Sequence, residues 1–309
     1  MKQIFVNLKR FDAPRQLGGV CPMADPIAWI ESVVDESVAF SLGAHADLAL
    51  TYLLPEGLVA AAARRLAQHP EAKRKMIAIG CQGVHWDDVR PGKNFGAFTT
   101  SVPAVAAANL GSQWAIIGHS EERRAKLQII SAYDASLATN ADARVRAASA
   151  VDQLVHDEVQ CALGAGLRAL MCVGESAEER GEGAFEEQQP RIERVLQAQV
   201  LHGLKGGESA IREGKVVIGY EPIWAIGPGK TPPGKEYIAF VSAFIQRVVR
   251  EQFGAEVVVV YGGGLKEENA AMIASIATIG GGLVALTQFT GEIGFSVAQL
   301  NAIVAKYLA

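Results

Sequence analysis

A glutamate ends one of the most apolar runs of the sequence, and a glycine-containing segment follows it. Glu221 comes directly after residues 217–220, and Trp224, Ile226 and Gly227 follow within six residues. A carboxylate that is partly buried at a strand end is suited to act as a general base. Apolar side chains can exclude water, while glycine lets backbone N–H groups approach an anion. The segment predicts a base beside a lid; a capping glutamate before an ordinary turn is the alternative.

A histidine occupies a similar place after another apolar run. His119 follows residues 114–118, and the residues from Ser120 onward can begin a helix. A helix N-terminus disfavours imidazolium, so a neutral ring could donate a hydrogen bond to a carbonyl oxygen and polarise it. A lone histidine at a strand end is more often structural. The catalytic interpretation therefore depends on Glu221 and a lysine lying nearby.

Two further segments could bind an anion. Asn7 and Lys9 lie two residues apart after the first apolar run, and they supply a neutral donor and a positive charge. Gly262, Gly263 and Gly264 precede a helical stretch, where their N–H groups could form a nest for a phosphate. For Asn7 and Lys9 alone, a solvated lysine and a turn asparagine are the favoured explanation. For the glycines alone, a plain turn is an equally good one.

These residues follow short apolar runs that alternate with longer helical stretches from end to end. The runs are nearly continuous, as in parallel strands that are covered on both faces. The predicted strands are 3–6, 47–51, 76–80, 114–117, 169–173, 216–219, 256–260 and 281–285. The predicted helices are 26–42, 56–68, 102–110, 141–163, 189–204, 235–252, 267–276 and 297–308.

Eight strands, each followed by a helix, predict an α/β fold of the (β/α)8 barrel type, with an open doubly wound sheet as the alternative. No linker-like stretch divides the chain, so residues 1–309 are expected to form a single barrel domain with extended loops. In a barrel, the polar residues after the strands would converge on the rim at the strands' carboxyl ends. Those residues are Asn7, Lys9, Gln82, His119, Glu175 and Glu221.

The composition excludes several other classes of protein. Lys and Arg number 29 against 33 acidic residues, so the basic excess of a nucleic-acid-binding protein is missing. The four cysteines show no metal-ligand spacing and suggest a reducing cytoplasm rather than a disulfide scaffold. The apolar runs are too short to cross a membrane, and the N-terminus lacks the pattern of a signal peptide. We expect a cytoplasmic protein.

Five motifs together resemble the triosephosphate isomerase family, in the family's order and over nearly the whole chain. They are Asn7-x-Lys9, Gly118-His119-Ser120-Glu121, Cys172-x-Gly174-Glu175, Tyr220-Glu221-Pro222-x-Trp224-Ala225-Ile226-Gly227 and Tyr261-Gly262-Gly263. The resemblance implies an aldose–ketose isomerase of glycolysis and gluconeogenesis that interconverts dihydroxyacetone phosphate and glyceraldehyde 3-phosphate. It also implies a homodimer, formed through a loop that includes Gly96–Thr99.

The resemblance further implies a role for each site residue. Glu221 would move a proton between adjacent carbons of an enediolate, and a neutral His119 would stabilise the oxyanion. Asn7 and Lys9 would support both binding and catalysis. The substrate phosphate would be bound by backbone N–H groups of three glycines, Gly227, Gly263 and Gly264. The family requires no metal and no organic cofactor.

The sequence departs from the family pattern mainly where the phosphate would bind. Ala285 and Leu286 replace two glycines after the eighth strand, Gly264 replaces a serine, and Pro228 replaces a threonine. Glu122 is an additional residue after the histidine motif. These departures leave two alternatives open: the same mechanism on a related short ketose or its phosphate, such as a tetrulose phosphate, and a non-catalytic binding protein with this fold.

The chain is also about 60 residues longer than a typical barrel of about 250 residues. We expect the extra length to remodel the rim that holds the substrate. The stretches that look long are 11–22, 86–93, 128–150 and 287–294.

Overall fold

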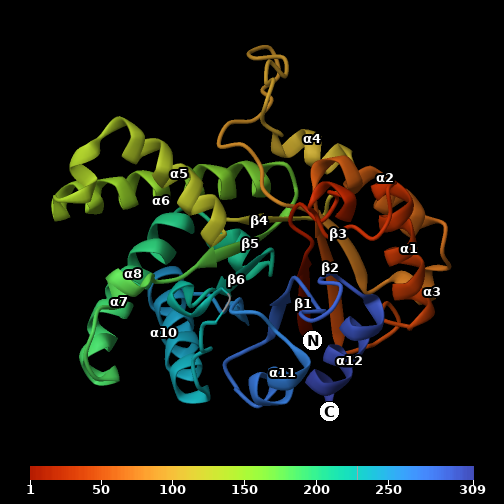
Figure 1. Ribbon diagram of the computed structural model, residues 1–309. Coiled ribbons are helices and arrows are strands. Elements are labelled where there is room, and N and C mark those ends of the chain that lie inside the picture. The colour runs from red at the N-terminus through yellow and green to blue at the C-terminus, as the bar shows by residue number, and fades with distance from the viewer. Residues whose placement is uncertain (228) are drawn as a thin grey trace.

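Residues 1–227 and 229–309 are described by a computed structural model, which is a closed barrel (Figure 1). Eight parallel strands pair in chain order, and β1 also pairs with β8. This closure confirms the barrel and excludes the open sheet. The strands are β1 Lys2–Asn7, β2 Leu48–Leu54, β3 Ile77–Cys81, β4 Trp114–Ile117, β5 Arg168–Val173, β6 Val216–Tyr220, β7 Val258–Tyr261 and β8 Gly281–Val284.

The strands are apolar on both faces because each face packs against a different core. Phe5 points into the barrel and meets Trp114 edge to face, with 5.0 Å between the ring centroids. Its neighbours Ile4 and Val6 belong to the larger core between the barrel and the helices. This arrangement explains why the strands appear in the sequence as continuous apolar runs.

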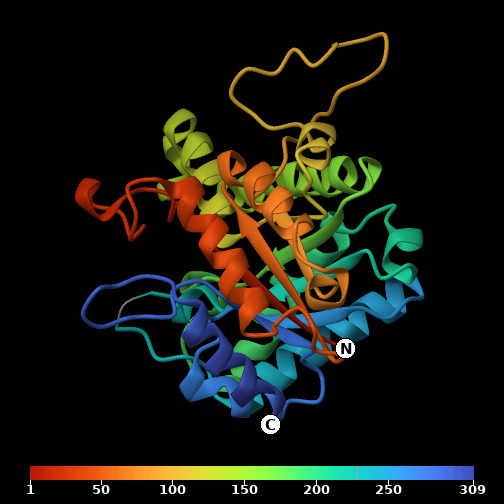
Figure 2. The same ribbon diagram turned by 90° about the vertical axis from the view of Figure 1, so that its right-hand side faces the viewer.

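Helices cover the outside of the barrel in both views (Figures 1 and 2). Helix α1 shows the expected start signals, since Asp25 accepts a hydrogen bond from the Ile27 N–H and Pro26 is its first residue. The helices are α1 Pro26–Ala39, α2 Glu56–Ala67, α3 Glu71–Arg74, α4 Ala104–Asn109, α5 Ser120–Tyr133, α6 Ala141–Gly164, α7 Ala177–Arg180, α8 Phe185–Gly203, α9 Glu208–Arg212, α10 Lys235–Phe253, α11 Glu267–Ala274 and α12 Val297–Leu308. Short 3₁₀ helices lie at Arg15–Leu17, Ala135–Ala138 and Ile223–Ala225.

The connection from β4 to β5 holds two long helices where the sequence analysis predicted only one. Helix α5 buries only Lys126, so it lacks the apolar periodicity that marks a helix in a sequence. Beyond the barrel, the end of α5 and the start of α6 form a small core of their own, in which Ile130 packs on Leu137, Ala143 and Ala147. The extra residues 128–150 are therefore largely helical.

Helix α8 begins at Phe185, four residues before its predicted start. The prediction placed Pro190 in the first turn, where proline is favoured, but the helix contains Pro190 in its interior. Phe185 packs on Tyr237 and Phe240 of α10, at centroid distances of 4.8 and 5.3 Å. These aromatic contacts anchor the additional turn.

The other extra stretches lie in connections after strands. The connections after β1 and β8 are joined by an ion pair of 2.6 Å between Arg15 and Glu292. The connection after β3 protrudes from the body in both views (Figures 1 and 2), and its Phe95 is 83% exposed. Within the described residues, no helix is both long and apolar enough to span a bilayer.

Candidate active site

The ends of β1, β4 and β6 bring four of the predicted site residues together. Asn7 ends β1, and Lys9 lies two residues after it. His119 lies two residues after β4, and Glu221 directly follows β6. The Glu221 N–H donates to the Val173 carbonyl of β5 at 2.8 Å, so the backbone is still held in the sheet at this point. The carboxylate therefore starts from a rigid position at the barrel rim.

The Glu221 carboxylate is buried and is held by donors from the first turn of α5. The backbone N–H of Ser120 donates to Oε2 at 2.9 Å, and the Ser120 hydroxyl donates to Oε1 at 3.0 Å. His119 Nε2 lies 3.2 Å from the same Oε1. Only 2% of Glu221 is exposed, so these three donors replace water around the carboxylate.

Gly262 makes room for the Glu221 side chain. A Cβ at this position would lie 2.8 Å from Glu221 Cγ and 2.8 Å from the Tyr220 carbonyl oxygen. Contacts this short do not occur without a shift of the neighbouring atoms, and Tyr220 is fixed in β6. The sequence analysis placed Gly262 in a possible phosphate nest and did not foresee that it packs against Glu221.

His119 is the N-cap of α5, and the hydrogen bond of its ring indicates the tautomer. Its Nδ1 accepts the Glu121 backbone N–H at 3.3 Å. A nitrogen that accepts a hydrogen bond carries no proton, so the proton of the neutral ring resides on Nε2. The ring therefore directs an N–H donor toward Glu221 Oε1.

Asn7 and Lys9 are positioned by each other and by Gln82. Asn7 Oδ1 accepts the Lys9 N–H at 3.0 Å and a Gln82 amide hydrogen at 3.2 Å. The same Gln82 nitrogen donates to the Lys9 carbonyl at 2.7 Å. Lys9 has a φ of 40°, a left-handed conformation that is costly for a residue with a Cβ. Gln82 was noted in the sequence only as a rim residue, and its contact with this turn could not be foreseen.

Lys9 is also linked to the histidine through Glu121. The Lys9 Nζ lies 2.6 Å from Glu121 Oε1. Partial burial alone would raise the pKa of Glu121, but the Lys9 ammonium lowers it below its ordinary value. Lys9, Glu121, His119 and Glu221 thus form one chain of contacts across the rim.

Glu175 is hydrogen-bonded to other residues than Lys9, His119 and Glu221 in the described part of the chain. It is fully buried, and its Oε1 accepts hydrogen bonds from Tyr220 OH, Trp224 Nε1 and Tyr237 OH at 3.0, 2.8 and 2.8 Å. Burial raises the pKa of Glu175, and the three donors only partly offset this effect. Glu175 anchors Trp224 in the segment that follows Glu221.

The predicted phosphate-binding glycines lie on neighbouring connections, but no hydrogen bond joins them to Lys9, His119 or Glu221 within the described part of the chain. Gly227 and Gly264 have φ values of 123° and 90°, which favour glycine. At Gly263, a Cβ would lie 2.2 Å from the Tyr261 hydroxyl oxygen. Pro228, which replaces a threonine of the family pattern, lies outside the residues that the structure describes.

The two residues that replace family glycines after β8 keep an ordinary backbone. Ala285 and Leu286 are half-buried, and neither adopts a positive φ. Residues with a side chain can present their N–H groups here only if φ stays negative, and both residues meet this condition. What changes is the presence of two side chains beside those groups.

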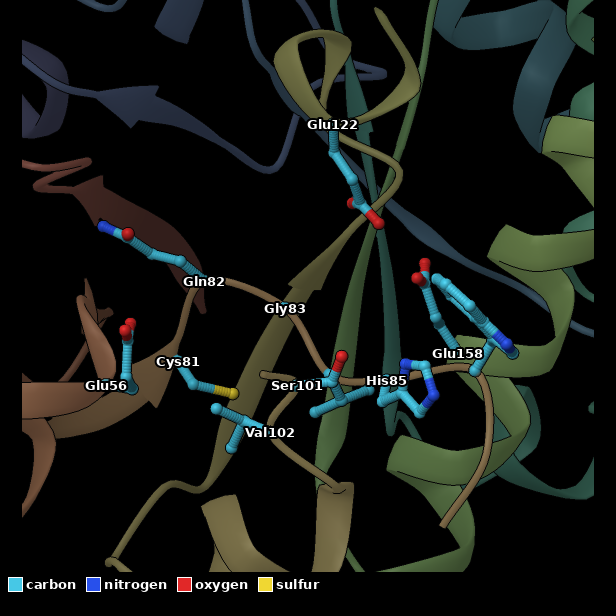
Figure 3. A pocket seen from close by; sticks show the side chains of 11 residues that line it. Glu56, Cys81, Gln82, Gly83, His85, Ser101, Val102, Glu122 and Glu158 are labelled. Carbon is cyan, nitrogen blue, oxygen red and sulfur yellow. The ribbon is translucent and has the colours of Figure 1, made fainter. Parts of the chain in front are cut away.

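A separate open cavity of about 270 Å³ lies next to the site (Figure 3). It is lined by the base of the protruding connection, including His85 and Val102, and by Glu122 and Glu158 of α5 and α6. It shares Gln82 with the site but does not reach His119 or Glu221. Among the described residues, no group of histidine, cysteine and acidic side chains is arranged to hold a metal ion.

Comparison with known proteins identifies the family of this chain. A sequence model of the family described as triosephosphate isomerase matches residues 43–292. The chain belongs to the triosephosphate isomerase family. It is 34% identical to the triosephosphate isomerase of Chlorobium phaeovibrioides over 216 residues, which are 69% of this chain and 71% of that protein. The corresponding enzyme of Chloroherpeton thalassium is 33% identical over 220 residues, covering 70% of this chain and 73% of that protein.

A crystal structure of triosephosphate isomerase from Bartonella henselae has the same fold. The TM-score is 0.66 at 25% sequence identity, and the match covers 100% of this chain and 99% of the other. The prediction of an isomerase of the triosephosphate isomerase type is confirmed at the level of the family. The family-model match begins after β1, so Asn7 and Lys9 lie outside it.

Proposed function

We propose that this protein interconverts dihydroxyacetone phosphate and glyceraldehyde 3-phosphate. The observation that carries the proposal is the chain of contacts from Lys9 through Glu121 and His119 to Glu221. The chain of contacts joins a buried carboxylate, an imidazole and an ammonium group that follow three strands of one barrel rim. A general base, a hydrogen-bond donor and a positive charge are groups that can support proton transfer through an oxyanion.

In the proposed mechanism, Glu221 removes a proton from the carbon next to the substrate carbonyl. The electron pair of the broken C–H bond forms the C=C bond of an enediolate, and the carbonyl oxygen becomes negatively charged. The Nε2–H of His119 donates to this oxygen, and Lys9 and Asn7 add electrostatic support. The neighbouring hydroxyl then loses its proton and the former carbonyl oxygen gains one, a transfer for which His119 Nε2 is the donor and acceptor. Glu221 returns its proton to the carbon that carried the carbonyl, and the electron pair of the other oxygen forms the new C=O bond. No proton is gained or lost overall.

We propose that backbone N–H groups of Gly227, Gly263 and Gly264 bind the substrate phosphate. Gly263 and Gly264 have N–H groups without a hydrogen-bond partner in the described part of the chain. Oriented N–H groups bind anions without a side-chain charge. Phosphate binding could be tested directly by titrating inorganic phosphate against the chemical shifts of these amides.

The wider assignments are also proposals. Residues 1–309 would form one barrel domain, in the cytoplasm, with neither nucleic acid nor membrane as a partner. A homodimer would form through the loop that contains Gly96–Thr99. The protrusion of this connection and the exposed Phe95 beside Gly96 support an interface there. Sedimentation of the wild type and of Phe95→Asp would test it.

The decisive experiment supplies each triose phosphate to the purified protein with a coupling dehydrogenase. We expect turnover, and we expect Glu221→Asp to lower kcat about 10²-fold or more because the carboxylate retreats by about one C–C bond. Near-normal turnover of this variant would remove Glu221 as the base.

A four-carbon ketose phosphate is the second candidate substrate for the same mechanism. It is favoured by the rebuilt rim, where Arg15 and Glu292 join two long connections and two side chains replace glycine hydrogens after β8. Turnover of a tetrulose phosphate without turnover of triose phosphates would select this candidate. Inactivity on all short sugar phosphates would favour a non-catalytic binding protein.

A further inference from the structure

The residue before His119 is held at both of its backbone polar groups by two consecutive residues of α5. The Gly118 N–H donates to Glu122 Oε2 at 2.7 Å. The Gly118 carbonyl accepts from Arg123 Nε at 2.8 Å. Gly118 has a φ of 72°, and a Cβ there would lie 3.1 Å from the Cys172 carbonyl oxygen. The peptide that leads from β4 into His119 is therefore tightly confined.

Both of these side chains are in turn linked to α6, Glu122 through Lys126 of α5 and Arg123 directly. Lys126 donates to Glu122 and, at 2.6 Å, to both carboxylate oxygens of Glu158. Arg123 Nη1 donates to Asp152 at 2.6 Å. Figure 3 shows the Glu122 and Glu158 side chains reaching toward one another from their two helices.

Burial and the neighbouring charges decide which of the two carboxyl groups, Glu122 or Glu158, is ionised. Glu158 is 3% exposed, and burial together with the nearby charge of Glu122 raises its pKa. Burial acts on Glu122 as well, but hydrogen bonding to Glu158 and the Lys126 ammonium lower the pKa of Glu122 below its ordinary value. Glu122 therefore remains ionised, and an ionised carboxylate is the stronger acceptor for the Gly118 N–H.

We propose that Glu122 is a positioning residue for His119: its carboxylate, held by Lys126 and Glu158, fixes the Gly118 peptide and thereby the direction of the imidazole Nε2–H. A displacement of about 1 Å in a reacting group can cost about 10²-fold in rate. A side chain that holds the Gly118 peptide in place can therefore affect catalysis without touching the substrate. This inference rests on the proposed role of His119.

The test compares Glu122→Ala with Glu122→Gln. The first removes the acceptor for the Gly118 N–H, and the second keeps an oxygen that can accept it. We expect Glu122→Ala to lower kcat about tenfold or more with KM nearly unchanged, and Glu122→Gln to retain most of the activity. Asn140→Ala is the matched control, because it removes the N-cap of α6 and lowers stability without changing the contacts of Glu122 and Arg123 with Gly118.

A second readout does not depend on activity. In protein with ¹⁵N-labelled histidine, His119 is assigned by comparison with His119→Gln, and its nitrogen shifts report which nitrogen carries the proton. We expect the Nε2–H signature in the wild type, in Glu122→Gln and in Asn140→Ala, and its loss or averaging in Glu122→Ala. If Glu122→Ala does not fold, Lys126→Met, which releases Glu122, takes its place with the same expectation.

If Glu122→Ala shows the same His119 nitrogen shifts and the same kcat as the wild type, the inference is wrong. A loss in Glu122→Gln as large as in Glu122→Ala would also overturn it, because the acceptor would then not be the cause. A wild-type protein that is inactive on triose phosphates would instead refute the proposed function, and the His119 shifts would still decide the positioning role.

Discussion

Gly262→Ala tests whether the exact placement of the Glu221 carboxylate controls turnover. The added Cβ would lie 2.8 Å from Glu221 Cγ, whereas carbon atoms in contact stay about 3.5–4.0 Å apart. The Tyr220 carbonyl oxygen, also at 2.8 Å, belongs to β6 and cannot yield easily. Glu221 must therefore move by about 1 Å, which is worth about 10²-fold in rate, or about 2.7 kcal/mol.

The assay is the coupled dehydrogenase reaction, with kcat and KM measured separately. We expect kcat to fall about 10- to 10²-fold and the free energy of unfolding to fall by about 1–3 kcal/mol from overpacking. Gly164→Ala is the matched control, because no atom lies within 4 Å of a Cβ there and the residue ends α6 away from the rim. A folded Gly262→Ala protein with wild-type kcat would refute the argument that this contact positions the base.

Three further variants address other parts of the site. Lys9→Met should lower kcat/KM on triose phosphates about 10³-fold, and full efficiency would end the electrostatic role of Lys9. Ser120→Ala should lower the free energy of unfolding in urea by about 1–3 kcal/mol, because the buried Glu221 loses a donor; an unchanged urea midpoint would contradict this. Glu175 has a raised native pKa, so the folded state binds its proton more tightly than the unfolded chain and stability falls as the pH rises above 4.5. Glu175→Gln should make the free energy of unfolding depend less on pH above 4.5. An unchanged pH dependence would show that other groups cause it.

The sequence was sufficient to predict the barrel because its local signals agree with the final fold. The strand from Trp114 to Ile117 is apolar on both faces and was predicted with the bounds that it has. Helix α5 was missed as a full helix because it lies largely in solvent, where packing imposes no apolar period. The apolar pattern of a sequence therefore predicts elements that pack against a core, but it predicts solvent-exposed helices poorly.

The site was predictable for residues that directly follow strands. His119 and Glu221 were predicted to share the rim because both follow strands, and the structure places His119 Nε2 3.2 Å from Glu221 Oε1. The support from Gln82 and the packing of Gly262 against Glu221 depend on contacts between different connections. Such contacts leave no periodic signal along the chain, so no spacing rule reveals them.

If Lys9 binds the substrate as proposed, its ion pair with Glu121 would couple substrate binding to proton uptake. A substrate oxygen that accepts from the Lys9 ammonium competes with Glu121, whose lowered pKa depends on that ammonium. As the ammonium turns to the substrate, the pKa of Glu121 rises, and burial raises it further. At mildly acidic pH, substrate binding would therefore be accompanied by proton uptake, and affinity for an anionic sugar would increase as the solution becomes more acidic, until the ligand itself is protonated.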